Sequence, residues 1–441
     1  MKRLQAHIKQ TIHNPNHKDI LSKSFGFIIF RGLGIIFGYA FTYLVASRYG
    51  ASMNGLITLG FAVFMFASTV STFGVDVHLV KYYSNPLKWK NEPGLFYKVY
   101  LKTFSLSLLI TLILYLFRDL IVVQLFNKPQ FIDVYLWAII AIPGWTMIKL
   151  SAGVLRAKGL NNWFSFFNNT GKFCFAFFLL LVFDFILISP LNAIKAHFYA
   201  ITFLSIIGFI VVYKNFKKIT ITGEENSWKF MTDSFPMLIS TSIIVFLNWI
   251  DSFVLGIYVS DSEIGVYNVA IKIALGASFA MEAINSGLAP RVARLYYEKK
   301  RVELDKLVRF STILNFIITV IITLILIIFN QFFLGLFGEE FKSGYWVLMI
   351  LCLMHLLNSF FGSAAIIMQM IGYHKQYQYN AILTLILNLV LNFILIPTYG
   401  NIGAAVGTSV SLTIWFVLNA IFLKRKENLV TYFNPFSKNI R

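Results

Sequence analysis

The chain has 441 residues, of which 58% are hydrophobic and 17% aromatic, and its mean hydropathy is +0.71. This composition excludes an ordinary soluble domain and a disordered chain, and it favours a membrane protein. The net charge of +19 is compatible with nucleic-acid binding, but the positions of the charges argue against that class. The two cysteines, Cys174 and Cys352, lie in apolar stretches, so neither a disulfide framework nor a thiolate metal site is predicted.

Twelve stretches of the chain are long and apolar enough to cross a bilayer as helices, which takes about 20 residues each. Before the first of them, residues 1–23 form a basic, polar tail that lacks the apolar core and cleavage site of a signal peptide. The predicted spans are 24–47, 54–80, 95–117, 131–155, 162–188, 192–213, 233–258, 264–289, 308–330, 343–371, 378–397 and 402–423.

Lys and Arg residues concentrate in the two tails and in the gaps that follow even-numbered spans. The gap after the sixth span, for example, contains Lys214, Lys217, Lys218 and Lys229. The alternate gaps contain few basic residues and collect acidic ones, so the positive-inside rule predicts that both termini are cytoplasmic. The positive charge then sets the orientation and attracts anionic lipid head groups, and we expect no nucleic-acid partner.

Two short stretches suggest that the chain repeats itself. Gly74 in GVDVHLVKYY and Gly287 in GLAPRVARLYY occupy corresponding places, and Lys81 and Arg294 keep the same separation. Both stretches lie where a long apolar run ends and a basic segment begins. They predict equivalent cytoplasmic ends for the second and eighth spans.

Two further matches extend the repeat. SAGVLRAKGLNNWFSF (151–166) aligns at the same separation with AAIIMQMIGYHKQYQY (364–379), and a looser match pairs Gly55 with Gly265. We therefore predict two six-helix halves in parallel orientation, with a transport path between them. The predicted parts are an N-terminal tail (1–23), an N-terminal lobe (24–213), a linker (214–232), a C-terminal lobe (233–423) and a C-terminal tail (424–441).

Four stretches carry a resemblance to a known family. RGLGIIFGYAFTYLVASRYG, FGVDVHLVKYY, GVYNVAIKI and YGNIGAAVGTSVS make the chain resemble the polysaccharide-transport flippases of the multidrug/oligosaccharidyl-lipid/polysaccharide superfamily over essentially all of 20–425. The resemblance implies an all-α, V-shaped fold of twelve transmembrane helices. It also implies movement of a lipid-linked O-antigen, capsule or exopolysaccharide repeat unit across the bacterial inner membrane by alternating access.

Basic side chains within spans are costly in a bilayer, so they are functional candidates. These are Arg31, Lys149, Lys172 and Lys272. Cationic walls would compensate the charge of a pyrophosphate or of acidic sugars while the lipid tail stays in the bilayer. Alternatively, these residues pair with acids or helix-end carbonyls to fix helix packing, and Lys149 could snorkel to the cytoplasmic surface.

Two acidic residues also fall within spans. Asp251 and Glu282 could bind a coupling proton or Na⁺, or could form ion pairs with Lys272. At the cytoplasmic span ends, Asp76 and Lys81 would suit helix capping or a gate, and Arg294 is the counterpart of Lys81. Apart from a coupling ion, no cofactor is predicted.

Other polar and aromatic side chains give weaker signals. His78, His197 and His355 are isolated, so packing is favoured over metal binding. Aromatic residues within the spans that could stack on a glycan are Trp145, Trp163, Trp249 and Tyr267.

Three alternative functions share part of this pattern. A multidrug exporter of the same superfamily would have the same fold, but an acidic cavity suits organic cations better than these basic residues do. A membrane polymerase or glycosyltransferase would need positioned acid and base groups, and no such constellation appears. Lipid II flippases resemble this chain but carry two additional helices. The expected partners are membrane lipids, lipid-linked oligosaccharide and proteins of polysaccharide assembly.

Overall fold

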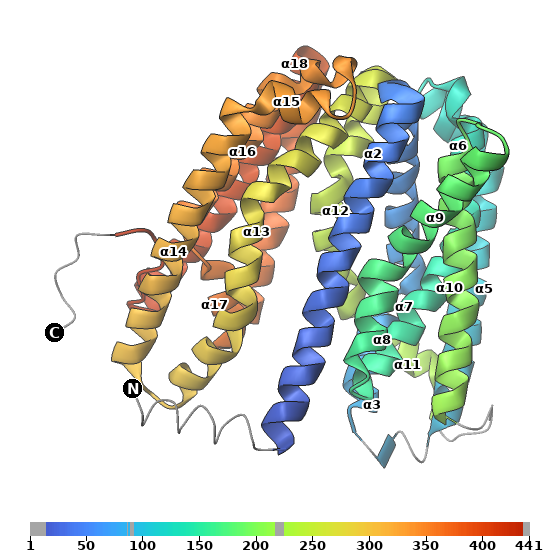
Figure 1. Ribbon diagram of the computed structural model, residues 1–441. Helices are drawn as coiled ribbons and strands as arrows, with labels where there is room; N and C mark the ends of the chain where they lie inside the picture. The colour runs from blue at the N-terminus through green and yellow to red at the C-terminus, as the bar shows by residue number, and fades with distance from the viewer. Residues whose placement is uncertain (1–14, 86, 89–91, 217–224, 435–441) are drawn as a thin grey trace. The chain divides into compact units, whose positions relative to one another are not determined.

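The computed structural model describes residues 15–85, 87–88, 92–216 and 225–434, and this part of the chain is helical and contains no strand (Figure 1). Parts of the predicted tails and linker, including Lys217 and Lys218, lie outside the described residues. The longer helices are α2 (Pro15–Thr72), α3 (Val75–Tyr83), α5 (Pro93–Leu116), α6 (Ile132–Ile140), α7 (Ile142–Ala157), α9 (Gly171–Ile186), α10 (Asn192–Phe216), α12 (Phe235–Tyr258), α13 (Asp261–Tyr297), α14 (Arg301–Ile328), α16 (Tyr345–Phe360) and α18 (His374–Glu427).

Short helical turns complete the spans. They are η1 (Leu120–Leu125), η2 (Pro129–Phe131), α8 (Asn161–Ser165), the π-helical η3 (Phe166–Thr170), α11 (Ser227–Asp233), α15 (Asn330–Gly335), η4 (Glu339–Gly344) and α17 (Ala364–Met370).

Nine helices in the described part are long and apolar enough to cross a membrane, and α13 is a further candidate, bent by 43°. Two of the nine contain a non-helical break, α2 at Gly50 and α18 at Gly400, and each covers two predicted spans. Every predicted span therefore has a helical counterpart, as expected of a multi-pass membrane protein.

Helix α14 shows why these helices suit a bilayer. Asn315, Thr319 and Thr323 on its inner face are each 0–1% exposed, whereas Phe310 and Ile321 on its outer face are 64% and 53% exposed. A soluble helix has the opposite arrangement, with its apolar stripe facing the core. The polar residues thus point into the protein and the apolar residues meet lipid.

The chain divides into two compact units, each described here by itself. Unit 1 comprises residues 1–44 and 63–242, and unit 2 comprises residues 45–62 and 243–441. The units differ from the predicted lobes because residues 45–62 pack within unit 2. The cause is a close backbone contact between α2 and α13 at two glycines. A Cβ on Gly55 would lie 1.8 Å from the Asp261 carbonyl oxygen, and a Cβ on Gly265 would lie 1.9 Å from the Ala51 carbonyl oxygen.

The matched turns of the predicted repeat have the same backbone geometry. Gly159 after α7 and Gly372 after α17 both have positive φ, 77° and 99°. In each turn the next residue donates its amide hydrogen to the carbonyl five residues back, Leu160 to Leu155 and Tyr373 to Met368. Both helices therefore end in the Schellman manner, which needs a left-handed residue after the helix.

The second and eighth spans differ at their matched glycines. Gly74 has φ of 71° and separates α2 from α3, and a Cβ there would lie 2.4 Å from the Leu238 amide nitrogen. Gly287 lies inside α13 with open space around it. Lys81 and Arg294 nevertheless occupy equivalent places, each in the last turn of its helix.

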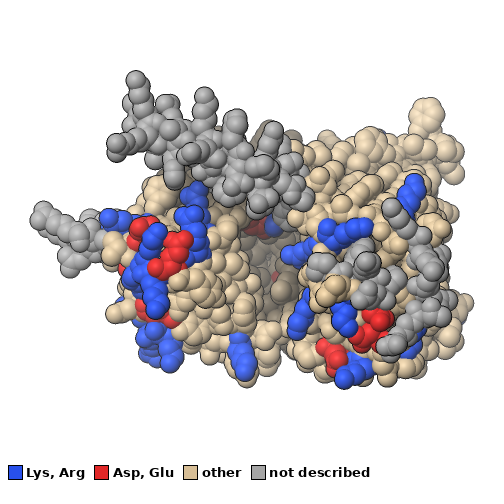
Figure 2. Space-filling view, turned by 90° about the horizontal axis from the view of Figure 1, so that it is seen from below, with Lys and Arg blue, Asp and Glu red and all other residues tan. Residues whose placement is uncertain are grey.

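Basic side chains lie in the last turns of helices in both units, and Figure 2 shows Lys and Arg, with some Asp and Glu among them, on the face seen from below. In unit 1 the last turns of α3, α7 and α10 contain Lys81, Arg156 and Lys214. In unit 2 the last turn of α18 contains Lys424, Arg425 and Lys426. A cation at a helix C-terminus is stabilised by the helix dipole.

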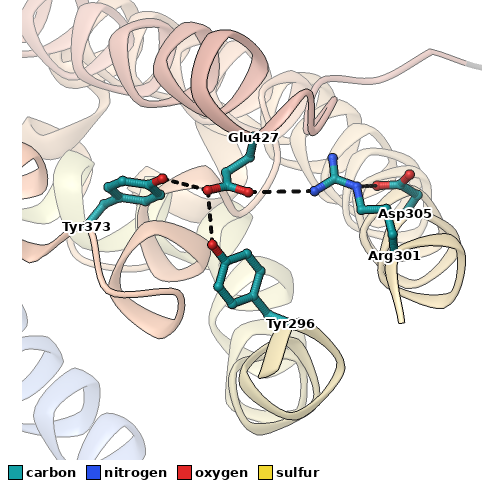
Figure 3. A network of polar contacts seen from close by, with 5 residues as sticks. All are labelled: Tyr296, Arg301, Asp305, Tyr373 and Glu427. Atoms are coloured by element: carbon teal, nitrogen blue, oxygen red, sulfur yellow. Dashed lines mark hydrogen bonds and ion pairs between the residues drawn. The ribbon is translucent and has the colours of Figure 1, made fainter. Parts of the chain in front are cut away.

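A network of polar contacts joins the ends of several helices in unit 2 (Figure 3). Tyr296 and Tyr373 donate hydrogen bonds to Glu427 Oε1 at 3.1 and 2.6 Å. Arg301 reaches Glu427 at 3.9 Å and Asp305 at 3.1 Å. The bond to Glu427 raises the pKa of Tyr373 to about 12, so its hydroxyl stays a donor at physiological pH.

Unit 1 contains a smaller network in the corresponding place. Lys88 Nζ lies 2.5 Å from Glu225 Oε1 and 5.2 Å from the ring centre of Tyr82. Both networks tie the end of the second span of their unit to the segment at or after its last helix.

Candidate functional site

Two of the predicted cations of unit 1 converge on one tryptophan. Trp145 on α7 is 3% exposed, and its ring centre lies 5.6 Å from Lys149 Nζ and 4.4 Å from Lys172 Nζ on α9. Lys149 also donates a hydrogen bond to Asn168 Oδ1 at 2.7 Å. An aromatic face attracts a cation that has lost water, so Trp145 stabilises two like charges within the span.

Arg31 on α2 joins this group through Asn168. It lines a cavity of about 430 Å³ with Arg156, Asn161, Phe164, Asn168 and Asn169. Helix α2 comes close to η3 because Gly34 has no side chain: a Cβ there would lie 2.9 Å from the Asn169 backbone. The π-helical turn η3 presents Asn168 and Asn169, and such turns are frequent at functional sites.

Asp76 is the acidic neighbour of this cluster. Helix α3 packs on α7 at Gly153, where a Cβ would lie 2.4 Å from the Asp76 carbonyl oxygen, and the Asp76 carboxylate attracts Lys149. Its Oδ1 is buried without a hydrogen-bond partner among the described residues. Asp76 therefore belongs with Lys149 as well as with the end of the second span.

Unit 1 thus places four cations and one carboxylate around a single region. The net charge of this region is positive, because the four cations, Arg31, Arg156, Lys149 and Lys172, outnumber the single carboxylate of Asp76. The side-chain amides of η3 add neutral hydrogen-bonding groups. An anion with several oxygens, such as a phosphate, is the ligand that this arrangement suits.

In unit 2, Asp251 on α12 lies at the centre of a buried hydrogen-bond network and is 6% exposed. The Thr408 hydroxyl and the Asn392 amide donate to its two oxygens, each at 2.6 Å, and the Tyr267 hydroxyl donates at 2.8 Å. Three donors match an ionised carboxylate, which accepts hydrogen bonds and donates none.

The network extends along α18. Asn388 donates to the hydroxyls of Thr408 and Ser411 at 3.0 and 3.1 Å, and Asn392 donates to Asn388 Oδ1 at 3.3 Å. The Asn392 Oδ1 atom is buried without a hydrogen-bond partner among the described residues. A carboxylate beside the unpaired amide oxygen of Asn392 suits a proton or a hard monovalent cation, which prefers oxygen ligands. Within the described ranges no group of three His, Cys, Asp or Glu residues could hold a metal ion.

The other predicted site residues lie on further parts of the described chain. Lys272 lies on α13 in unit 2. Glu282 lines a cavity in unit 2 that Asn248 also lines. Lys81 and Arg294 are exposed at helix ends, and Arg294 lies 3.8 Å from Glu298.

Comparison with known families now places the chain. The family model described as "Polysaccharide biosynthesis protein" matches residues 18–296, and the model described as "MatE" matches residues 236–394. The first match covers more than half of the chain. The chain belongs to the polysaccharide biosynthesis protein family. Arg31, Lys149, Lys172 and Asp251 all lie within the matched residues.

Curated relatives of this polysaccharide biosynthesis protein match over part of their length. A probable low-salt glycan biosynthesis flippase of Haloferax volcanii is 26% identical over 40% of this chain and 38% of its own. A capsular polysaccharide biosynthesis protein of Staphylococcus aureus is 27% identical over 37% of this chain and 41% of its own. The matches thus span about two fifths of the relatives' lengths.

Solved structures establish the fold of this family member. A multidrug resistance transporter of the MATE family, of the MOP superfamily, in an inward-facing conformation aligns with a TM-score of 0.70 at 15% identity, covering 90% of this chain and 96% of that chain. The lipid II flippase MurJ in an inward closed conformation aligns with a TM-score of 0.73 at 16% identity, covering 92% and 87%. The predicted fold class is confirmed.

Several residues of these centres were not predicted from the sequence. Asn388 and Asn392 stand four apart in LILNLVLNFIL, which puts both on one face of an apolar helix, and this spacing was a readable signal. Thr408 and Asn168 gave no such signal, because their roles depend on which helices pack against their own. Arg156 was counted among the cytoplasmic basic residues although it lines the cavity with Arg31.

Proposed function

We propose that this protein is a flippase that moves polyprenyl-pyrophosphate-linked oligosaccharide from the cytoplasmic to the outer leaflet by alternating access, and that it is a transporter and not an enzyme. The observation that carries the proposal is the convergence of Arg31, Lys149 and Lys172 around Trp145 and Asn168 within unit 1.

The physical requirement is compensation of a pyrophosphate charge in a medium of low dielectric. Burying an isolated ion costs roughly several kcal/mol of free energy, even after the protein relaxes around it. Cations within the spans supply the opposite charge, and the polyprenyl tail needs no compensation because it stays among lipid chains. The cluster in unit 1 therefore fits the charged end of the cargo.

The Asp251 network supports cation coupling. Its buried carboxylate and oxygen-rich surroundings would take up H⁺ or Na⁺. Neutralising Asp251 changes the charge of a packed core that α12, α13 and α18 share. Such a change can shift the equilibrium between two conformations of these helices.

The orientation proposed for the chain follows from its basic helix ends. Lys81, Arg294 and the basic run at the end of α18 face the cytoplasm, which puts both termini on that side of a bacterial inner membrane. Proteins that polymerise and export the glycan would act on the cargo after it is flipped.

Depletion of the protein in its host tests this function. Mass spectrometry of the polyprenyl-pyrophosphate oligosaccharide pool should then show a build-up of complete lipid-linked repeat units while surface polysaccharide is lost. An unchanged pool would rule out the flippase.

Charge neutralisation tests the cationic residues. Arg31→Gln combined with Lys272→Gln should abolish export at unchanged protein abundance, and Lys149→Gln combined with Lys172→Gln should do the same. Lys195→Gln is the matched control, because Lys195 also lies over a tryptophan ring, Trp137 at 5.9 Å, outside the cluster. Full export by both double variants would contradict the role of the cations.

A cation-coupled multidrug exporter is the second candidate. The match of residues 236–394 to the MatE model and the carboxylate of Glu282 on a cavity wall favour it. New sensitivity of depleted cells to cationic drugs, together with an unchanged lipid-linked pool, would identify this function.

A further inference from the structure

Unit 2 contains a second cavity that the anion-binding cluster does not use. Its volume is about 340 Å³, and five helices, α12, α13, α14, α16 and α18, contribute to its walls. Small-ligand sites range from about 300 to 1,000 Å³, so this cavity suits a fragment of a ligand and not a whole lipid-linked oligosaccharide.

Three buried polar atoms on the cavity wall have no hydrogen-bond partner among the described residues. They are Asn285 Oδ1, Thr319 Oγ1 and Trp415 Nε1. An unpaired buried polar group costs about 1–3 kcal/mol, so such groups call for a partner outside the chain. The set combines an acceptor, a hydroxyl and a donor, and a ligand that carries several hydroxyl groups would satisfy all three.

Two aromatic rings form another part of the wall. Tyr377 and Trp415 both lie on α18, and their ring centres are 5.6 Å apart at an angle of 57°. A sugar ring carries C–H groups on its faces and hydroxyls at its edge. Aromatic faces therefore cover the apolar side of a sugar while the polar atoms beside them bind its hydroxyls.

The charge of this cavity is opposite to that of the cavity in unit 1. Glu282, His355 and Tyr377 are its ionisable lining residues, and no Lys or Arg of the described chain lines it. Arg31 and Arg156 line the unit 1 cavity. A pyrophosphate is thus disfavoured here, and a neutral or amino sugar is favoured.

We propose that the unit 2 cavity binds one neutral or amino sugar residue of the cargo glycan, with Trp415 and Tyr377 as its stacking surface and Asn285, Thr319 and Glu282 as its polar contacts. This inference rests on the proposed flippase function and adds a glycan subsite to it. The protein then selects cargo by its sugar as well as by its pyrophosphate.

The test measures binding of defined lipids to the full-length protein in nanodiscs. The probes are undecaprenyl pyrophosphate without sugar, and the same lipid bearing N-acetylglucosamine or glucose. Wild-type protein should bind at least one sugar-bearing probe about tenfold more tightly than the bare lipid. Trp415→Ala and Asn285→Ala should remove this difference while binding of the bare lipid stays unchanged.

Two further variants keep the test independent of folding. Trp415→Phe retains a stacking ring without the N–H donor and should retain part of the preference. Trp346→Ala is the matched control, because Trp346 belongs to unit 2 and is 58% exposed outside the cavity. It should bind all probes as the wild type does.

Three outcomes would overturn the inference. Equal binding of bare and sugar-bearing lipids by wild-type protein would reject the glycan subsite and leave the flippase proposal standing. Failure of wild-type protein to bind any of these lipids would reject the flippase proposal, and the subsite with it. Loss of tetraphenylphosphonium binding in Glu282→Gln and Trp415→Ala, with sugar preference intact, would assign the cavity to organic cations.

Discussion

Lys149 and Lys172 show how a membrane span tolerates basic side chains. Each contact with the Trp145 ring is worth about 0.5–2 kcal/mol, and Lys149 gains a hydrogen bond to Asn168 as well. These contacts hold the ammonium groups inside the protein, where a cargo phosphate can meet them. The sequence alone marks the basic residues within the spans as functional candidates, because a charged side chain is costly in lipid. It does not mark Asn168, because Asn168 becomes a neighbour of Lys149 only when α7 and η3 pack together.

Asp251 yields a prediction at the same scale. Asp251→Asn keeps the size of the side chain but replaces one acceptor oxygen with a donor that faces Tyr267 and Thr408. We expect transport to fall at least tenfold and to lose its dependence on an H⁺ or Na⁺ gradient, with a loss of unfolding free energy of about 1–3 kcal/mol. Reconstituted vesicles with imposed gradients provide the measurement.

The control for Asp251→Asn is a carboxylate at a helix end of the same unit. Asp305→Asn removes the contact to Arg301 and should leave the ion dependence of transport unchanged. Gradient-dependent transport by Asp251→Asn at the wild-type rate would show that the network only holds α12 and α18 together.

Within unit 2, α2 and α13 come into close backbone contact at two glycines. Gly55 and Gly265, which the sequence repeat paired, touch each other, and Asn54 donates a hydrogen bond to the Gly265 carbonyl at 3.0 Å. Such close packing uses small residues because lipid offers no hydrophobic drive for helix association.

Alanine at this contact should be strongly unfavourable. A Cβ on Gly265 would overlap the Ala51 carbonyl, so Gly265→Ala must push the helices apart, at a cost of about 1–3 kcal/mol or more. Gly287→Ala is the control, because open space surrounds Gly287 inside the same helix, and alanine there should stabilise by up to about 1 kcal/mol. Thermal unfolding in detergent compares the two, and equal melting temperatures would contradict the close contact.

The ion pair between Lys88 and Glu225 gives a pH-dependent prediction. The hydrogen bond from Lys88 lowers the pKa of the Glu225 carboxyl, so this ion pair stabilises unit 1 at neutral pH and is lost as pH falls through that lowered pKa. Hydrogen exchange of α11, corrected for intrinsic rates, should be faster in Glu225→Gln than in wild type at pH 7. The difference should vanish in strong acid, and a difference that persists there would exclude this ion pair as its cause.

The spans themselves were well predicted because about 20 apolar residues have few other uses. The break at Gly74 was not, because Gly287 shows that a matched glycine can equally lie inside a continuous helix. The two glycines differ in their neighbours: Leu238 comes close to Gly74, whereas no described residue comes within 4 Å of the Cβ position of Gly287. Such contacts between segments that are distant in the chain cannot be predicted from the local sequence.

The whole molecule divides its chemistry between two units of similar helix pattern. Unit 1 contains a cluster of cations, whereas unit 2 contains the Asp251 network and a cavity free of basic lining residues within the described chain. The parallel repeat was predictable from matched turns. The sequence alone treats Arg31, Lys149, Lys172 and Lys272 as one set of candidate cargo contacts, and that set stays a prediction.

The most direct test of the flippase proposal is translocation by purified protein in proteoliposomes. A fluorescent polyprenyl-pyrophosphate oligosaccharide is placed in both leaflets, and its accessibility to a membrane-impermeant quencher is followed over time. We predict that wild-type protein and Lys195→Gln make the inner-leaflet lipid accessible, whereas Lys149→Gln combined with Lys172→Gln does so at least tenfold more slowly. Translocation no faster than in protein-free vesicles, or equal rates for all three proteins, would contradict the account.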